Sequence, residues 1–324
     1  MSSRLPRGIV APGIVLGATA LAGGLAFAWG SLVERKMFTL RRVTVPVLPP
    51  GAEPIRVLHV SDLHMAPWQR DKQAWVRSLA QLRPDLVVDT GDNLGHEGGI
   101  DGIEAAFSGY GDVPGVYVNG SNDYHGPMRK NWLRYLVRHT GGAKVAPPDL
   151  DTPRLERFFR EGLGWISLNN AVGSLTIKGT RLEFFGVDDP HIGRDRLDRL
   201  TGLIDAQQDE ETLDDDASDA ERTVTIGVAH APYRRVLASF VTHGADLILA
   251  GHTHGGQVCV PFFGALVTNC DIPRRQVKGL SMWRHAYRSA HLHVSAGLGT
   301  SIYAPVRFAC LPEATLLTLV PAER

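Results

Sequence analysis

The sequence contains few cysteines. Only three occur among its 324 residues, and no two of them are spaced as CxxC; they are Cys259, Cys270 and Cys310. A small, odd number of cysteines without CxxC pairs argues against a disulfide framework and against a cysteine-ligated zinc site. One disulfide is still allowed, so the cysteines do not indicate the redox compartment.

Net charge is also absent. Lys and Arg total 34, as do Asp and Glu, so the formal charge is zero. Nine of the acidic residues lie within residues 205–221, which carry no basic residue, and the rest of the chain therefore has 25 acidic against 34 basic side chains. The acidic segment is predicted to be a solvated, disordered insertion. The arginines are scattered and form no basic stripe, so nucleic acid is not an expected partner.

Charged side chains are missing from one long stretch, between Ile9 and Val33. A helix rises about 1.5 Å per residue, so a helix of this length spans the roughly 30 Å hydrocarbon core of a bilayer. Residues 1–33 are therefore predicted to be a single-pass anchor in the cell membrane. The alternative is a cleaved signal peptide, because residues 26–28 are Ala-Phe-Ala, but the apolar run continues beyond this small-x-small site.

The basic residues around this stretch indicate an orientation. Two precede it and four follow it; they are Arg4 and Arg7, then Arg35, Lys36, Arg41 and Arg42. The positive-inside rule favours the cytoplasmic side for the main domain.

The whole chain is 44% hydrophobic and long enough to bury a large core. Residues 34–54, with the Pro- and Gly-rich VPVLPPG, are predicted to be an extended linker. From residue 55 to 324, short β-branched runs alternate with polar loops. The runs are 55–60, 85–90, 115–119, 182–187, 223–229, 245–250, 291–296 and 314–320, and helical patterns cover 71–82, 154–163 and 232–244. This alternation predicts one layered α/β domain with a mixed or two-sheet core.

Polar residues follow five of the predicted strands at their carboxyl ends. They are Asp62, His64, Asp92, Asn122, His230, His252 and His254. Such ends open onto one crevice in an α/β sheet, so these side chains are expected to meet. Nitrogen and oxygen donors without sulfur suit Mn, Fe or Zn rather than Ca. Seven donors are too many for one tetrahedral site and predict two divalent ions sharing a ligand, an arrangement suited to phosphoryl transfer.

The motifs SDLH, TGDN, GSND, HAP and GHTHGGQ occur in that order. They resemble the calcineurin-like metallophosphoesterase family, whose pattern is DxH, GDxx, GNH[DE], H and GHxH, over about 80% of the chain. The resemblance implies an α/β/β/α sandwich that hydrolyses phosphoester or pyrophosphate bonds with a metal-bridging hydroxide. It assigns Asp62, His64 and His254 to the first metal, Asp92 to both metals, and His230 and His252 to the second.

Softer motifs indicate a branch of this family. The N-terminal apolar segment, HGGQV and the ending PVRFACLPEATLLTL look like the membrane-associated branch near UDP-2,3-diacylglucosamine pyrophosphohydrolase-like phosphoesterases. A phosphorylated small-molecule, nucleotide-sugar or lipid-linked substrate is expected, together with a monomeric state. The apolar residues 258–267 beside the histidine motif favour a lipid portion in the substrate, unless they form a core strand.

The chain departs from the family pattern where GSND replaces GNH[DE]. Either Ser121 takes the ligand position and Asn122 that of the catalytic histidine, or the loop shifts and Asn122 remains the ligand; the second alignment is preferred because a Ser hydroxyl is a poor ligand. Asn122, Asp123 and His125 are the candidate catalytic residues. His125 is the nearest substitute for the missing histidine unless it belongs to a surface turn. His96 and His191 are interpreted as loop residues, with lining of the site as the alternative. The alternative function is a membrane-tethered, metal-binding module without catalysis.

Overall fold

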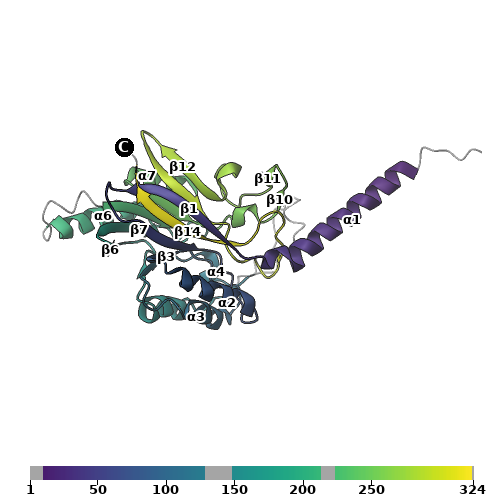
Figure 1. Ribbon diagram of the computed structural model, residues 1–324, viewed down its shortest axis with the longest axis horizontal. Coiled ribbons are helices and arrows are strands. Elements are labelled where there is room, and N and C mark those ends of the chain that lie inside the picture. The colour runs from purple at the N-terminus through teal and green to yellow at the C-terminus, as the bar shows by residue number, and fades with distance from the viewer. Residues whose placement is uncertain (1–9, 128–147, 213–222, 323–324) are drawn as a thin grey trace, which may run out of the picture.

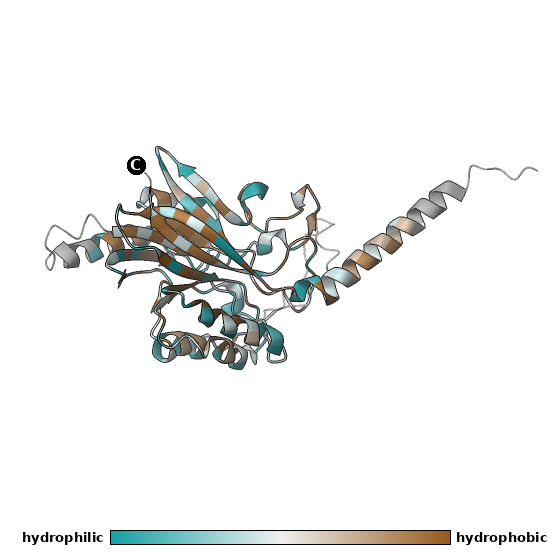
Figure 2. Ribbon diagram, viewed as in Figure 1, coloured by the Kyte–Doolittle hydropathy of each residue, from teal (hydrophilic) through white to brown (hydrophobic). Residues whose placement is uncertain are grey.

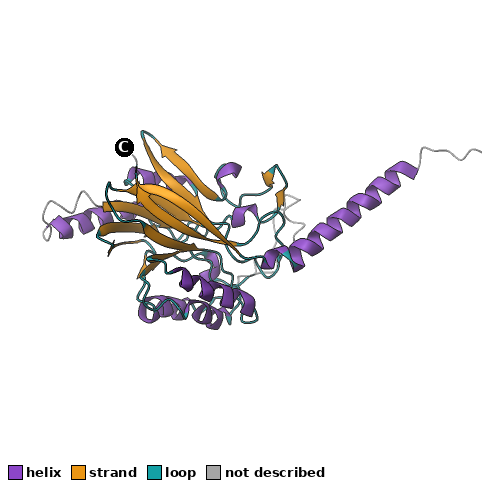
Figure 3. Cartoon of the chain, viewed as in Figure 1, coloured by secondary structure: helices purple, strands orange, loops and turns teal. Residues whose placement is uncertain are grey.

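Two six-stranded sheets form the centre of the computed structural model, which describes residues 10–127, 148–212 and 223–322 (Figure 3). The first sheet has the order β1(Thr39–Leu48)-β14(Glu313–Pro321)-β2(Ile55–Val60)-β3(Leu86–Asp89)-β4(Gly115–Tyr117)-β5(Ile166–Ser167). The second has the order β12(Gly279–His285)-β13(Arg288–Val294)-β9(Leu247–Ala250)-β8(Thr223–Ala229)-β7(Thr180–Val187)-β6(Ala171–Ile177). Both sheets mix parallel and antiparallel pairs.

The core lies in three layers. One apolar cluster joins the first sheet to α2(Arg70–Ser78), α3(Gly99–Phe107) and α5(Thr152–Arg157), and another lies between the two sheets. A third joins the second sheet to α6(Leu197–Thr212) and α7(Arg234–Thr242). Helices therefore cover the outer face of each sheet (Figure 1), and the predicted mixed α/β sandwich is confirmed.

Central strands are apolar on both faces because both faces are covered. In β2, Leu58 and Val60 pack toward the helices while Ile55 and Val57 pack between the sheets. Figure 2 shows the hydrophobic colouring concentrated on the strands. This two-sided burial explains why the runs were recognisable as strands without clean alternation.

The predicted extended linker is wrong for residues 39–48. Residues 39–48 form β1, which pairs in parallel with β14 at the edge of the first sheet. Pro46 lies at a register irregularity near the end of this strand. An edge strand tolerates the missing amide hydrogen, so the proline did not exclude a strand.

Part of the acidic segment is helical. α6 continues to Thr212, so residues 205–212 belong to it, whereas residues 213–221 lie outside the described residues. Ala, Gln and Glu in this stretch are good helix formers, which explains why the acidic charge did not prevent a helix.

The N-terminal segment is a helix, α1(Val10–Leu32), that extends away from the rest of the molecule (Figure 1). Its described side chains Leu21, Leu25, Phe27 and Leu32 are exposed. Over the part of the chain that the structure describes, no helix combines the length and hydropathy required to cross a membrane. The predicted transmembrane helix is therefore not confirmed.

Candidate metal centre

The predicted ligands come from loops at one edge of the two sheets. Loops after β2 and β3 supply Asp62, His64 and Asp92 from the first sheet, and loops after β8 and β9 supply His230, His252 and His254 from the second. All six side chains are buried. The sandwich thus brings donors from both sheets to one place.

The backbone at these ligands is strained. Asp62, His64, Asp92, His252 and His254 have φ between +40° and +68°. Non-glycine residues in this left-handed region cost about 1–3 kcal/mol each, and such residues concentrate at functional sites. Five strained residues among the seven predicted ligands favour a functional reason for the geometry.

The first cluster consists of Asp62, His64 and His254, whose ligand atoms lie within 4.8 Å of one another. The Nε2 atoms of His64 and His254 are 3.2 Å apart, and His254 Nε2 is 3.5 Å from Asp62 Oδ1. Burial lowers the pKa of both histidines. Both imidazoles are therefore neutral, which is the form that binds metal.

The second cluster consists of Asp62, Asp92 and His230. Asp92 Oδ2 lies 3.5 Å from Nε2 of both His64 and His230, so this carboxylate is positioned between the clusters. Burial opposes charge on Asp92 and His230, but their mutual attraction dominates: the pKa of Asp92 lies well below its usual value and that of His230 well above. A cation at this position would replace the proton on His230.

His252 adjoins the second cluster. Its Nδ1 is 3.3 Å from His230 Nε2, and burial, together with His230, lowers the pKa of His252 to about 3. The backbone amide of His252 donates to the carboxylate of Asp62 at 2.9 Å. His230 donates its other ring nitrogen, Nδ1, to the Thr90 carbonyl at 2.7 Å, which leaves Nε2 free to be a ligand.

Close packing requires a glycine at one contact. A Cβ on Gly120 would lie 2.7 Å from Asp92 N and 2.8 Å from His230 Cε1, and nearer still to Asp92 Oδ1. Any side chain there would push the two ligands apart.

The GSND segment forms the short helix α4(Ser121–Tyr124). Asn122 donates from its amide and from Nδ2 to the two oxygens of Asp92, each at 2.8 Å. Asn122 therefore contacts the carboxylate between the two clusters.

Asp123 is fully buried, and its oxygens accept backbone amides of Asp92, Asn93, Leu94 and Gly120 at 2.7–3.1 Å. This carboxylate fastens the Asp92 loop to α4.

His125 instead pairs with the exposed Asp149 at 3.1 Å, and no described contact joins it to a predicted ligand.

His191 lies beside the predicted ligand His252 at the metal centre, although its sequence context favoured a loop residue. Its ring centroid is 4.4 Å from that of His252, and its Nδ1 is 2.9 Å from the Tyr233 hydroxyl. His191 is itself exposed. Sequence reasoning missed it because only folding brings the loop after β7 beside the loop after β9.

Arg307 was also missed. It is completely buried, and its Nη2 donates to the carbonyls of Ala296, Gly297 and Gly299 at 2.7–3.0 Å. The same atom lies 3.4 Å from His254 Nδ1. Arg307 therefore holds the loop after β13 against a predicted ligand.

The donor set fits two divalent cations. Oxygen and nitrogen atoms converge without sulfur, and the two clusters share Asp62. Borderline divalent ions accept this set, and it would otherwise be a costly group of buried polar side chains.

Comparison with known proteins agrees with this geometry. Residues 55–256 match the family described as Calcineurin-like phosphoesterase, which is more than half of the chain. The chain belongs to this family and is a metallophosphoesterase. Calcineurin-like phosphoesterases use a dinuclear site of divalent metals, and the two clusters are its candidate ligands here.

Particular relatives extend the match. The chain is 24% identical over 314 residues to the uncharacterized metallophosphoesterase YkuE of Bacillus subtilis, covering 94% of this chain and 93% of the relative. It is 41% identical over 75 residues to phosphodiesterase YaeI of Escherichia coli, covering 23% of this chain and 25% of the relative. It is 27% identical over 226 residues to a Bos taurus transmembrane protein with metallophosphoesterase domain, covering 67% and 44%.

Proposed function

We propose that the chain hydrolyses a phosphodiester or pyrophosphate bond with two divalent ions, Mn, Fe or Zn. The observation that carries this proposal is the convergence of five buried oxygen and nitrogen donors in two clusters that share Asp62, with the buried His252 beside the second cluster. Asp62, His64 and His254 would hold one ion, and His230 and His252 the other. Asp92 would bind both, with Asn122 as a further ligand.

When bound, the two ions activate a water nucleophile and stabilise charge on the phosphoryl group. The chain's own residues orient this chemistry. Asn122 holds both oxygens of Asp92, and Asp123 fastens the loops on either side. Asp123 is thus proposed to position the site, while Asn122 lies close enough to contact the substrate.

Hydrolysis of bis-p-nitrophenyl phosphate tests the proposal. Asp92→Asn should reduce the metal content of both clusters, because this carboxylate lies between them. Several kcal/mol of lost transition-state stabilisation corresponds to a fall of roughly 100- to 1,000-fold in rate. Asp112→Asn, the same change on an exposed residue, should leave rate and metal content unchanged. Full metal occupancy without any turnover in the wild type would support the non-catalytic alternative.

We further propose that the enzyme acts at the cell membrane, with its domain on the cytoplasmic side and a lipid-linked or nucleotide-sugar phosphate as substrate. Exposed apolar residues support the membrane contact: Phe262, Phe263, Leu266 and Val267 lie on or beside the hairpin of β10(Cys259–Val260) and β11(Gly264–Ala265). Val258, at the base of this hairpin, bridges to Phe308, and the neighbouring Arg307 amide bonds to Gly30 of α1. The hairpin and α1 therefore lie at the same end of the domain (Figure 1).

Vesicle co-sedimentation tests this contact. Phe262→Ser with Phe263→Ser should weaken binding to phosphatidylcholine–phosphatidylglycerol vesicles, because two exposed aromatic rings would no longer enter the lipid. Tyr287→Ser is the matched control, because Tyr287 is fully exposed on the turn between β12 and β13. Equal binding by both variants would contradict the proposed orientation.

A further inference from the structure

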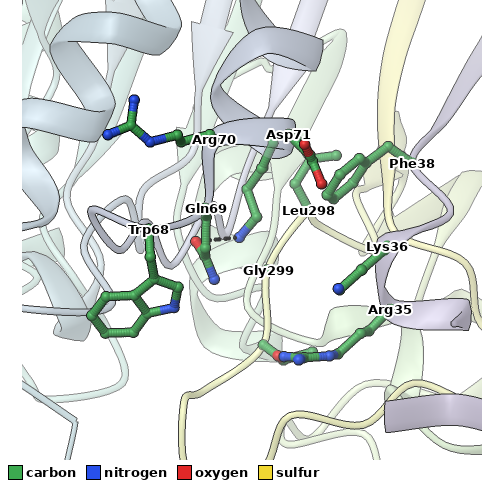
Figure 4. A pocket seen from close by; sticks show the side chains of 11 residues that line it. Arg35, Lys36, Phe38, Trp68, Gln69, Arg70, Asp71, Leu298 and Gly299 are labelled. Carbon is green, nitrogen blue, oxygen red and sulfur yellow. Dashed lines mark hydrogen bonds between the residues drawn. The ribbon is translucent and has the colours of Figure 1, made fainter. Parts of the chain in front are cut away.

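A pocket with a volume of about 200 Å³ adjoins the loop that carries Asp62 and His64. The helical turn η1(Glu34–Lys36), directly after α1, forms one side, and the start of α2 and the loop after β13 form the others. Figure 4 shows Arg35 and Lys36 reaching in from η1, opposite Trp68 and Gln69. The volume is below the roughly 300–1,000 Å³ of sites for drug-sized ligands, so it suits a small group.

The pocket lining carries more basic than acidic side chains. Its lining includes Arg35, Lys36, Arg70 and Lys72, with Asp71 as the only acid. No ion pair among the described residues involves any of these four cations. Like charges gathered without acidic partners repel one another, and a bound anion would remove that cost.

Two of these cations have features expected of an anion site. Arg35 Nε is buried and has no hydrogen-bond partner. Lys72 is buried and donates only to neutral acceptors, the Leu63 carbonyl at 2.6 Å and Gln69 Oε1 at 3.0 Å. Burial, with Arg307 and Arg35, lowers the pKa of Lys72 to about 7. The nearby Glu34 accepts hydrogen bonds from Trp29 and Cys310, and no described ion pair joins it to these cations.

The pocket shares a wall with the metal loop. Lys72 holds the carbonyl of Leu63, the residue between two predicted ligands. Gly299, in the pocket lining, donates its amide to the Asp62 carbonyl at 2.6 Å. On its other side the pocket adjoins η1, which continues from the exposed α1. It therefore lies between the proposed membrane contact and the catalytic centre.

We propose that this pocket, the η1 pocket, binds the phosphate group of an organic phosphate ester. Arg and Lys form charge-assisted hydrogen bonds with phosphate oxygens, and Trp68, exposed at the rim, can lie in the headgroup region of a bilayer. The phosphate can come from a membrane phospholipid or from a soluble phosphate ester. That the phosphate belongs to a lipid rests on the membrane contact proposed above. That the pocket binds a phosphate group does not depend on that contact.

The experiment compares Lys36→Ala with wild type, using the full-length, metal-loaded protein. Lys36 is exposed and makes no described ion pair, so its removal should not unfold the domain. One arm measures binding to phosphatidylcholine vesicles with and without phosphatidylglycerol, and the other measures binding of glycerol 3-phosphate by calorimetry. One cation near a lipid surface contributes about 1 kcal/mol, so Lys36→Ala should bind about 5-fold more weakly.

Three controls make the result specific. Lys36→Arg keeps the charge and should retain binding. Arg284→Ala removes an exposed charge from β12, outside the pocket, and should bind like wild type. Asp92→Asn should lose hydrolysis yet keep Lys36-dependent binding, which separates this proposal from the catalytic one.

Each outcome is decisive. Dependence on Lys36 in the vesicle arm identifies a lipid phosphate, and dependence only in the calorimetric arm identifies a soluble one. If Lys36→Ala equals Arg284→Ala in both arms, the η1 pocket is not a phosphate site.

Discussion

The missing family histidine leads to a sharp prediction about proton transfer. The GSND segment has no histidine where the family has the one beside the substrate. Among the described histidines, His191 packs against a predicted ligand, His252, without being one itself. We therefore expect His191 to protonate the departing oxygen, with the Tyr233 hydroxyl fixing the ring through Nδ1. The perturbation is His191→Ala.

The expected loss of rate in His191→Ala follows from the exposure of the His191 side chain. General acid catalysis contributes about 10²–10⁴-fold, and an exposed acid competes with water as a proton source, which favours the lower end. We expect a loss of about 100-fold, or roughly 2.7 kcal/mol, for diesters with an alkyl alcohol leaving group. A nitrophenolate leaves without a proton, so bis-p-nitrophenyl phosphate hydrolysis should change by no more than a few-fold.

The assay measures kcat/KM for a methyl nitrophenyl diester, a dialkyl diester and bis-p-nitrophenyl phosphate. His125→Ala is the matched comparison, because His125 is the histidine nearest the GSND segment in sequence and pairs with Asp149. Selective loss of dialkyl hydrolysis in His191→Ala supports the assignment. If His125→Ala shows that selectivity and His191→Ala slows every ester equally, the reasoning from geometry is refuted and His125 is the acid.

Three further perturbations follow from the described contacts. Gly120→Ala should reduce metal content and lower activity at least about 100-fold, since its Cβ would displace Asp92 and His230; Gly111→Ala, where a Cβ meets nothing within 4 Å, should have normal metal content by elemental analysis. Arg307→Met should weaken metal binding about 10- to 100-fold in equilibrium dialysis because His254 loses its neighbour, whereas an unchanged affinity would limit Arg307 to loop packing. His293 contacts His59 at 2.9 Å between the sheets, and burial lowers the pKa of His293 from 6.5 to about 4. The unfolded chain then binds more protons below pH 6.5, so His293 should contribute up to about 3 kcal/mol to the fall in the unfolding free energy of chelator-treated protein as pH drops toward 4. His293→Gln should flatten the slope in urea titrations by this share.

Local pattern was sufficient for much of the fold. The strands predicted at 55–60 and 223–229 have the same bounds in the structure, because a buried β-branched run followed by a polar loop is a local signal. The ligand positions after these strands were predictable for the same reason. The residues that terminate a strand are neighbours in sequence of the residues that form it.

Tertiary structure decided the contacts between segments distant in sequence. β1 was predicted to be linker because its partner, β14, lies at the other end of the chain, and pairing with that partner is what makes it a strand. His191 meets His252, Arg307 meets His254, and the cations of η1 meet Lys72 only in the folded chain, because the members of each pair lie far apart in sequence. Sequence determined which chemical groups end each strand, since that depends on local order. Tertiary packing determined which of these groups contact one another, because burial of apolar surface depends on the whole chain and cannot be read from the local sequence pattern.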